Sequence, residues 1–258
     1  MFDLAYRLYE RRLEHEVRVA GQGPEHIALI LDGNRRHGER YGLRDPSAIY
    51  TLGASKLDEV LDWCAELSVP AVTLWVLSTD NFDRPTEQVS GILGAIGTKL
   101  SALAVDPQIH CRRVRIQAIG QLDMLPEPTR AAIEAAQKAT ADYDGMVLTI
   151  AVAYGGRAEI VDAVRSLLED CSKRGVTLEQ AITSVDAEAI SRHLYMAGMP
   201  DPDLIIRTSG EVRLSGFLLW QSAYSEFYFS DVYWPAFRRI DLLRAIRAYQ
   251  QRRRRFGG

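Results

Sequence analysis

The stretch HIALILDGNRRHGERYGL, residues 26–43, changes abruptly from apolar to polar. It contains the uninterrupted apolar run IALIL (27–31), a pattern typical of a strand that is covered on both faces of a sheet. An acid, two glycines and two arginines follow directly, in the segment DGNRRHG (32–38). The stretch therefore predicts a buried parallel strand that ends in a polar turn able to bind a ligand.

Further apolar runs follow along the chain, and helical patterns separate most of them. The runs are AVTLWVLS (71–78), VRIQAIG (114–120), MVLTIAVAY (146–154), DLIIRT (203–208) and EFYFSD (226–231). The helical patterns span residues 47–67, 86–104, 126–141 and 157–171. This alternation predicts an α/β fold with one six-stranded, mostly parallel sheet flanked by helices. No linker or repeat divides the chain, so we expect a single domain over 1–258, with an amphipathic helix at 1–22 and a basic tail at 252–258.

The composition is that of an ordinary globular protein and argues against a nucleic-acid partner. Of the 258 residues, 47% are hydrophobic and 25% are charged, and the net charge is −3. The first residues carry too many charges for a secretory signal, and no apolar run is long enough to span a membrane, so we expect a cytoplasmic protein. A helix at 1–22 suits a peripheral contact with the inner face of the plasma membrane as well as a packed or dimer-facing position, and its pattern does not separate these alternatives.

Polar side chains follow the ends of several predicted strands. Ligands of open parallel sheets bind outside the carboxyl ends of the strands, so these side chains are expected to share one crevice. Arginine forks and glycine amides bind phosphate oxygens, and several arginines indicate more than one phosphate group. The side chains are Asp32, Gly33, Asn34, Arg35 and Arg36 after the first strand, Ser78, Asp80, Asn81 and Arg84 after the second, Arg157 after the fourth, and Arg207, Ser209, Arg213 and Ser215 after the fifth.

An acid among these arginines would repel a bare phosphate unless a divalent cation lay between them. Magnesium usually takes one or two carboxylates together with substrate phosphates, so Asp32 and Glu226 are the candidate metal ligands. The ordinary alternative is that Asp32 and Gly33 form a simple turn and that the arginines are solvated. Several such segments at one sheet edge favour the phosphate site.

The helical pattern at 86–104 is apolar and rich in small residues, with Gly91, Gly94, Ala95 and Gly97. Such a helix beside a sheet could line an apolar tunnel, and its small residues could equally serve close packing, which is the commoner use. Neither a G-x-x-x-x-G-K-[ST] loop nor a G-x-G-x-x-G after a strand is present, so the sequence shows no nucleotide-binding fingerprint.

Five blocks of the sequence resemble one known family, the cis-prenyltransferases or undecaprenyl diphosphate synthase-like enzymes. The resemblance spans nearly the whole chain, and within the family it is strongest to the short-chain mycobacterial type that makes (2Z,6E)-farnesyl diphosphate. The blocks are LILDGNRR (29–36), STDNFDRP (78–85), AYGGRAEIVDA (153–163), DLIIRTSGEVRLSGFLLWQSAYSEFYFSDVYWPAF (203–237) and RRFGG (254–258).

The resemblance implies an enzyme that condenses isopentenyl diphosphate with an allylic diphosphate, forms a cis double bond and releases pyrophosphate. It implies Mg²⁺ as cofactor, with Asp32 under the allylic diphosphate and Glu226 as a second acidic contact. Asp32 and Asn81 are the expected catalytic residues, Asn81 acting with Ser78 near the proton that leaves isopentenyl diphosphate. The expected substrate-binding residues are Gly33, Asn34, Arg35, Arg36 and Arg44 for the allylic diphosphate, Ser78 and Arg84 beside it, and Arg207, Arg213 and Ser215 for isopentenyl diphosphate.

The resemblance also implies a homodimer. The segment FLLWQSAYSEFYF (217–229) would build the dimer interface. The terminal Arg255, Phe256 and Gly257 would reach the neighbouring active site.

The chain departs from the family pattern around the allylic loop, which favours a short product. We expect geranyl diphosphate as primer and (2Z,6E)-farnesyl diphosphate as product, with Leu77 and Ile96 as plugs of a shallow tunnel. A long-chain decaprenyl or undecaprenyl diphosphate synthase, or a non-catalytic subunit of a hetero-oligomeric enzyme, remain alternatives at this point. The departures are Arg35 for Gly, His37 for Trp, Tyr50 near an expected His, Asp80 for Glu, Val212 for His and Gly216 for Asn.

Overall fold

The computed structural model describes residues 2–256, and the side chains of residues 5–252. Its centre is a six-stranded sheet in the order β3-β4-β2-β1-β5-β6, and every strand pair is parallel. The predicted α/β fold is thus confirmed, with a sheet that is wholly rather than mostly parallel. The strands are β1 (His26–Ile30), β2 (Ala71–Trp75), β3 (Arg115–Ile119), β4 (Val147–Ala151), β5 (Leu204–Arg207) and β6 (Glu226–Phe229).

Helices connect the strands, and all the long ones except the last lie where the sequence predicts them. The last helix, at Arg239–Phe256, includes part of the segment expected as a basic tail at 252–258. The short helices α2, α5, α8 and α9 were not predicted, because a helix of five to seven residues is too short to show an amphipathic period. The helices are α1 (Phe2–Ala20), α2 (Asn34–Arg40), α3 (Pro46–Glu66), α4 (Thr86–Leu103), α5 (Pro107–Cys111), α6 (Glu127–Ala139), α7 (Gly156–Lys173), α8 (Leu178–Ser184), α9 (Ala187–Ser191) and α10 (Arg239–Phe256).

Both faces of the sheet are covered, which explains the uninterrupted apolar runs. Ile27 and Leu29 of β1 belong to the larger core, which the sheet forms with α1, α3, α4, α6 and α10. Ala28 and Ile30 face the other way and belong to a smaller core with Phe217. Successive residues of a strand point to opposite faces, so a strand buried on both sides is apolar at every position.

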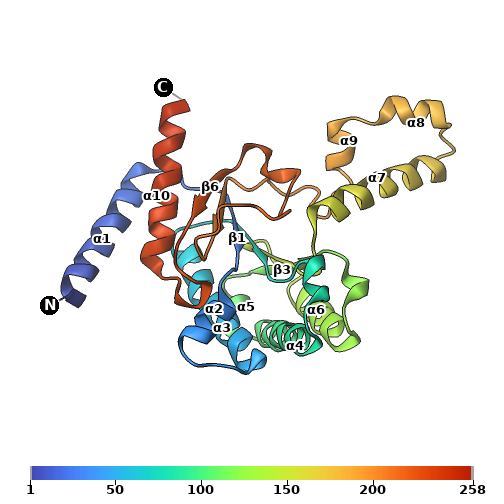
Figure 1. The fold of residues 1–258 in the computed structure, drawn as a ribbon. Coiled ribbons are helices and arrows are strands. Elements are labelled where there is room, and N and C mark those ends of the chain that lie inside the picture. Colours follow the sequence, from blue (N-terminus) through green and yellow to red (C-terminus); the bar gives the residue numbers. More distant parts are fainter. Residues whose placement is uncertain (1, 257–258) are drawn as a thin grey trace.

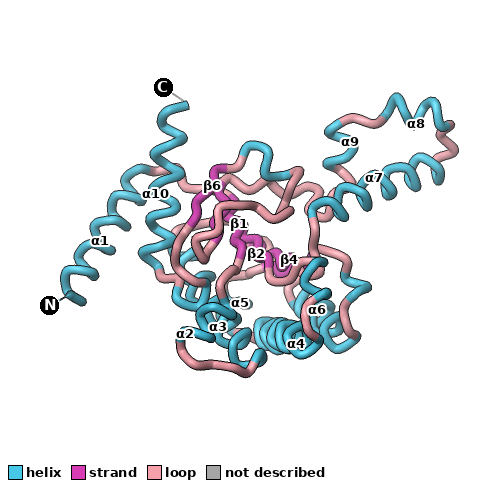
Figure 2. The backbone as a smooth tube through the Cα atoms, in the orientation of Figure 1, coloured by secondary structure: helices cyan, strands magenta, loops and turns pink. Residues whose placement is uncertain are grey.

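Two helical projections extend from opposite sides of this body (Figure 1). On one side α1 lies along α10, and the two helices are joined by an ion pair of 2.9 Å between Arg239 and Glu14. On the other side α7, α8 and α9 form an arm that reaches away from the sheet, and Figure 2 shows the same arm as a chain of helices and loops. None of the helices in the part of the chain that the structure describes is long and apolar enough to cross a membrane.

The register of the three central strands brings their carboxyl ends together. Ile30 at the end of β1 pairs with Trp75 at the end of β2 and with Arg207 at the end of β5. The loops that follow these strands therefore leave the same edge of the sheet side by side. Glu226 pairs instead with Leu204 at the start of β5, so it lies at the opposite edge.

Candidate active site

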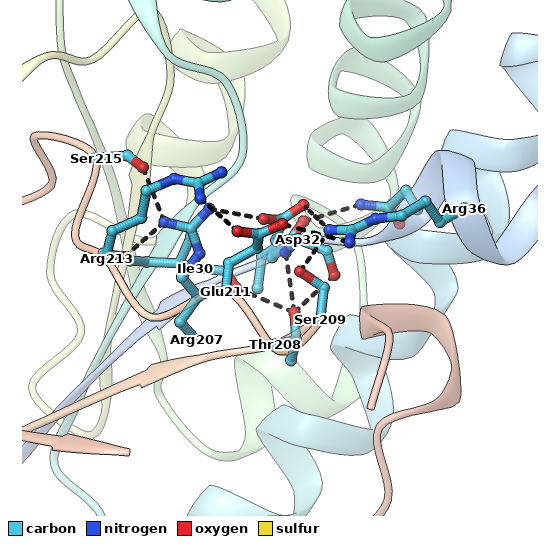
Figure 3. Close-up of polar contacts among 11 residues, drawn as sticks. Ile30, Asp32, Arg36, Arg207, Thr208, Ser209, Glu211, Arg213 and Ser215 are labelled. Atoms are coloured by element: carbon cyan, nitrogen blue, oxygen red, sulfur yellow. Dashed lines mark hydrogen bonds and ion pairs between the residues drawn. The ribbon is translucent and has the colours of Figure 1, made fainter. Parts of the chain in front are cut away.

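An ion pair between Asp32 and Arg207 lies at the carboxyl ends of β1 and β5 (Figure 3). Nη2 of Arg207 lies 2.7 Å from Oδ2 of Asp32, and Nη1 donates to the hydroxyl of Ser215 at 2.8 Å and to the carbonyl of Arg213 at 2.6 Å. Only 6% of the Arg207 side chain is exposed, whereas Asp32 is 30% exposed and faces the cavity. The arginine thus fixes the acid and the loop after β5 in one arrangement.

The carboxyl group of Asp32 is held in its ionised form. Burial by itself would raise the pKa of Asp32, but the hydrogen bond and positive charge of Arg207, helped by Ser209 and the Gly33 amide, outweigh it and lower the pKa below its ordinary value. Asp32 therefore carries a negative charge at neutral pH. Such a carboxylate can bind a cation or orient a donor.

Gly33 links the strand to α2 and has to be a glycine. Its φ of +98° is left-handed, and a Cβ at this position would lie 2.6 Å from the ring of Tyr233. The turn presents Arg36, whose Nη2 donates to the hydroxyl of Ser209 at 2.8 Å and lies 3.6 Å from Oδ1 of Asp32. The first loop and the loop after β5 are joined in this way.

The loop after β5 places its polar side chains through unusual backbone angles. Ser209 and Ser215 have positive φ values of 81° and 53°, which non-glycine residues adopt only where the surroundings enforce them. Between them, Glu211 forms ion pairs with Arg36, at 3.4 Å, and with Arg213. A carboxylate therefore lies between two arginines that belong to different loops.

The loop after β2 adds a third wall. Ser78 forms a bridge with Tyr154 beyond the end of β4, and its amide donates to Oδ1 of Asn81 at 3.2 Å. This contact caps the amino end of the short 3-10 helix at Thr79–Asp83, and Arg84 follows the helix at its carboxyl end. Ser78, Asn81 and Arg84 all line the same cavity as Asp32.

These three loops enclose a polar cavity of about 570 Å³, hereafter the polar cavity. It brings together residues from every predicted segment of the strand ends except the one after β4. The predicted residues that line it are Asp32, Gly33, Asn34, Arg35, Arg36, Ser78, Asp80, Asn81, Arg84, Arg207, Arg213 and Ser215.

Four residues that the sequence placed at this crevice do not line the cavity within the chain, namely Arg44, Arg157, Ser209 and Glu226. Glu226 was expected beside Asp32, but it begins a parallel strand and so lies at the amino edge, where it binds Nη1 of Arg252 at 2.6 Å. Arg44 is exposed between α2 and α3 and does not line the cavity. The predicted terminal contacts of Arg255, Phe256 and Gly257 lie outside the part of the chain whose side chains are described.

A second, apolar cavity of about 90 Å³ adjoins the polar one, between α3, α4 and the sheet, hereafter the apolar cavity. Ile96 lines it as predicted, but Leu77 lines the polar cavity instead, so the expectation that both plug one tunnel is wrong for Leu77. On α4, Ala95 lines the apolar cavity. A Cβ at Gly91 would lie 3.0 Å from Pro46, so this glycine serves the close packing of α3 on α4.

Some residues of the site were not singled out from the sequence as site residues. Glu211 lies in the segment RTSGEVR, and its position between Arg207 and Arg213 could have indicated that it pairs with the arginines of the site. Trp75 and Tyr50 both line the polar cavity, and neither the indole nitrogen nor the phenol hydroxyl has a hydrogen-bond partner among the described residues. No sequence pattern marks such unpartnered donors, because they are defined by packing.

The residues around Asp32 fit a magnesium ion only if substrate phosphates and water supply most of its ligands. No group of three or more His, Cys, Asp or Glu side chains that could hold a metal occurs within the described residues. Magnesium is often held by one carboxylate and completed by substrate phosphates and water. Asp32, ionised and partly exposed in a cavity lined by arginines, suits that arrangement.

The two adjoining cavities define a class of protein, an enzyme whose ligand has an anionic head and an apolar tail. Comparisons with known proteins agree with this class. A family model described as putative undecaprenyl diphosphate synthase matches residues 30–257. The solved structure of lavandulyl diphosphate synthase from Lavandula x intermedia, in complex with dimethylallyl diphosphate, matches with a TM-score of 0.79 and 31% identity, covering 88% of this chain and 95% of that chain.

Two curated relatives match at higher identity. The (2Z,6E)-farnesyl diphosphate synthase of Thermobifida fusca is 50% identical over 252 residues, which make up 98% of this chain and 96% of that protein. The tritrans,polycis-undecaprenyl-diphosphate synthase (geranylgeranyl-diphosphate specific) of Methanopyrus kandleri is 48% identical over 252 residues, 98% of this chain and 91% of that protein. The chain belongs to the undecaprenyl diphosphate synthase family of cis-prenyltransferases, and is a prenyl transferase.

Proposed function

We propose that this cis-prenyltransferase adds one isopentenyl diphosphate to geranyl diphosphate and releases (2Z,6E)-farnesyl diphosphate and pyrophosphate. The observation that carries the proposal is the small volume of the apolar cavity beside a large polar one. The polar cavity has room and charge for two diphosphates. The apolar cavity limits how long a hydrocarbon tail can become.

The arginines divide between the two substrates. Arg36 and the turn at Gly33 would bind the allylic diphosphate, and Arg207, Arg213 and Ser215 would bind isopentenyl diphosphate. Cationic donors stabilise the negative charge that develops on a departing diphosphate, and two adjacent sites orient the reacting carbons. The amide of Asn81, held by Ser78, would lie near the proton that leaves the new bond.

Asp32 would hold a magnesium ion between itself and the substrate phosphates. When bound, this ion would neutralise diphosphate charge and so favour departure of the leaving group. Arg207 would keep Asp32 ionised and pointed at the cavity, as it does in the structure.

The size of the apolar cavity supports a short product. A cavity of about 150 Å³ accommodates benzene, which has six carbons. The apolar cavity, at about 90 Å³, is smaller than this, so the ten-carbon tail of geranyl diphosphate already requires side chains of its wall to move, and a much longer tail would require a larger rearrangement. It extends along α4 from Ile92 to Leu103, roughly 16 Å of helix. Its wall includes Lys99, whose ammonium group pairs with Asp58 of α3.

A long-chain polyprenyl diphosphate synthase is the second candidate, because the family model and the Methanopyrus relative carry undecaprenyl names. A long product would require α3 and α4 to move apart or the Lys99–Asp58 pair to break. The Thermobifida relative, at similar identity, carries the farnesyl name. The relatives' names therefore do not separate the two products, and the cavity favours the short one.

The experiment is a comparison of primers and products. The protein is incubated with Mg²⁺, labelled isopentenyl diphosphate and either geranyl, neryl or farnesyl diphosphate, and the dephosphorylated products are separated by chain length. We expect geranyl diphosphate to give the highest kcat/KM and a fifteen-carbon product. A preference for farnesyl diphosphate with products of fifty carbons or more would support the long-chain alternative.

A further inference from the structure

The junction between the polar and the apolar cavity is the place where the reacting bond of an allylic diphosphate would lie. An allylic diphosphate has to place its anionic head in one cavity and its hydrocarbon tail in the other. The bond between C1 and the ester oxygen, which breaks in the reaction, therefore lies at the junction. The residues that line both cavities are Leu31, Asn34, Tyr50, Val76 and Ile92.

Two of these junction residues are polar, and each has an unpartnered polar atom. The hydroxyl of Tyr50 and Oδ1 of Asn34 are both buried, and neither has a hydrogen-bond partner among the described residues. Buried polar atoms without a partner are uncommon in proteins, and each one asks for an explanation such as a bound ligand. Both residues line the two cavities, at the junction where the substrate bond would be.

Asn34 and Tyr50 lie at the same face of α3. Oδ1 of Asn34 lies over Gly53, where an added Cβ would approach it to 2.2 Å, so the glycine makes room for it. Tyr50 precedes Gly53 by three residues, which places both on the same face of the helix. Oδ1 of Asn34 is a carbonyl oxygen and can only accept, while its Nδ2 donates to the carbonyl of Leu31 at 2.9 Å. Of the two unpartnered atoms, the Tyr50 hydroxyl is therefore the one that can donate.

We propose that Tyr50 is a catalytic residue that donates a hydrogen bond to the ester oxygen of the allylic diphosphate. This inference rests on the proposed function, because it requires the head and tail of the substrate in the two cavities. As the C1–O bond breaks, its electron pair moves to the ester oxygen of the departing pyrophosphate. C1 forms a new bond with isopentenyl diphosphate, which loses a proton to an oxygen of that pyrophosphate. A donor aimed at an oxygen whose negative charge grows binds the transition state more strongly than the substrate.

The test is the variant Tyr50→Phe, which removes only the hydroxyl. We expect kcat to fall about 10- to 100-fold, while KM for each substrate changes less than about threefold. The melting temperature without substrate should be unchanged or higher, because the hydroxyl makes no hydrogen bond that folding could lose. A structural role would give the opposite result, a lower melting temperature.

Tyr6→Phe is the matched control. The Tyr6 hydroxyl on α1 is also buried without a partner among the described residues, but Tyr6 lines neither cavity, so its removal should leave kcat unchanged. A wild-type kcat in Tyr50→Phe, or a loss of kcat accompanied by a lower melting temperature, would overturn the role of Tyr50. If the wild-type enzyme condensed no allylic diphosphate, the proposed function would fail and this inference with it.

Discussion

At the scale of single residues, the pair of Asp32 and Arg207 shows how structure and chemistry depend on each other. Arg207 is almost wholly buried and needs an anion, and Asp32 needs a cation to remain ionised in a half-buried place. Removing one partner of a buried pair costs about 3–5 kcal/mol of folding free energy, because the other charge is left without compensation. Here Arg207 also binds Ser215 and the carbonyl of Arg213, which lessens that cost.

We predict that Asp32→Asn lowers kcat at least about 100-fold in saturating Mg²⁺, because the amide cannot hold the cation. Asparagine keeps an oxygen for Arg207, so the melting temperature should fall by only a few degrees. Steady-state kinetics and thermal melts measure both quantities. Asp144→Asn, at an exposed pair with Arg113, is the control and should behave as wild type. Near-normal turnover of Asp32→Asn would remove Asp32 from the catalytic site.

At the scale of elements, the loop after β5 carries most of the residues that we propose for the second diphosphate site. The side chain of Arg207 binds the backbone of this loop at the carbonyl of Arg213, whereas the side chain of Arg213 is exposed and, among the described residues, pairs with Glu211. Arg207 also contacts Asp32, so replacing it would disturb both substrates. Arg213 is therefore the better probe of the isopentenyl diphosphate site.

We predict that Arg213→Ala raises KM for isopentenyl diphosphate about 10- to 100-fold, because a charge-assisted hydrogen bond contributes roughly 1.5–3 kcal/mol. KM for geranyl diphosphate should change much less. Initial rates at varied concentrations of each substrate separate the two effects. If only the allylic KM rose, the two diphosphate sites would have to be exchanged.

The helix α4 has one face that packs against α3 and one that lines the apolar cavity. Its small residues therefore serve both close packing and the apolar cavity, the two alternatives that the sequence left open. Gly91 permits close contact with Pro46, and Ala95 and Ile96 line the apolar cavity. We predict that Ile96→Ala lengthens the product by at least one isoprene unit, because the growing tail gains apolar space. Chromatography of the dephosphorylated products measures the length.

Two controls accompany this variant. Leu93→Ala lies on the same helix and is equally buried but lines neither cavity, so it should leave product length unchanged. Leu77→Ala should do the same, because Leu77 lines the polar cavity. An unchanged product in Ile96→Ala would place the limit elsewhere along the apolar cavity.

At the scale of the whole molecule, the sequence predicts the sheet well because the inner strands β1, β2, β4 and β5 are buried on both faces. Its apolar runs are continuous, and the polar loops that leave the carboxyl edge are visible as sharp changes after each run. Adjacent strand ends are implied by a parallel sheet, which is why residues as distant as Asp32 and Arg207 could be assigned to one crevice.

The sequence was less informative where the outcome depends on which end of a strand a residue occupies, or on side-chain packing. Within the chain, Glu226 begins its strand and so lies at the edge opposite to the site, and its expected metal contact stays a prediction. The different positions of Leu77 and Ile96, and the unpartnered hydroxyl of Tyr50, follow from side-chain packing, which no periodic pattern encodes. The expected homodimer stays a prediction. Tyr224, in the segment expected at its interface, is 98% exposed in the chain.

The most direct test of the account is the chain length of the wild-type product. Geranyl diphosphate, excess isopentenyl diphosphate and Mg²⁺ are incubated until isopentenyl diphosphate is consumed or turnover stops, and the alcohol products are identified by mass and by the geometry of each double bond. We expect a fifteen-carbon alcohol with one new cis bond, and no longer species, because the apolar cavity is small. Polyprenols of fifty carbons or more would contradict the account.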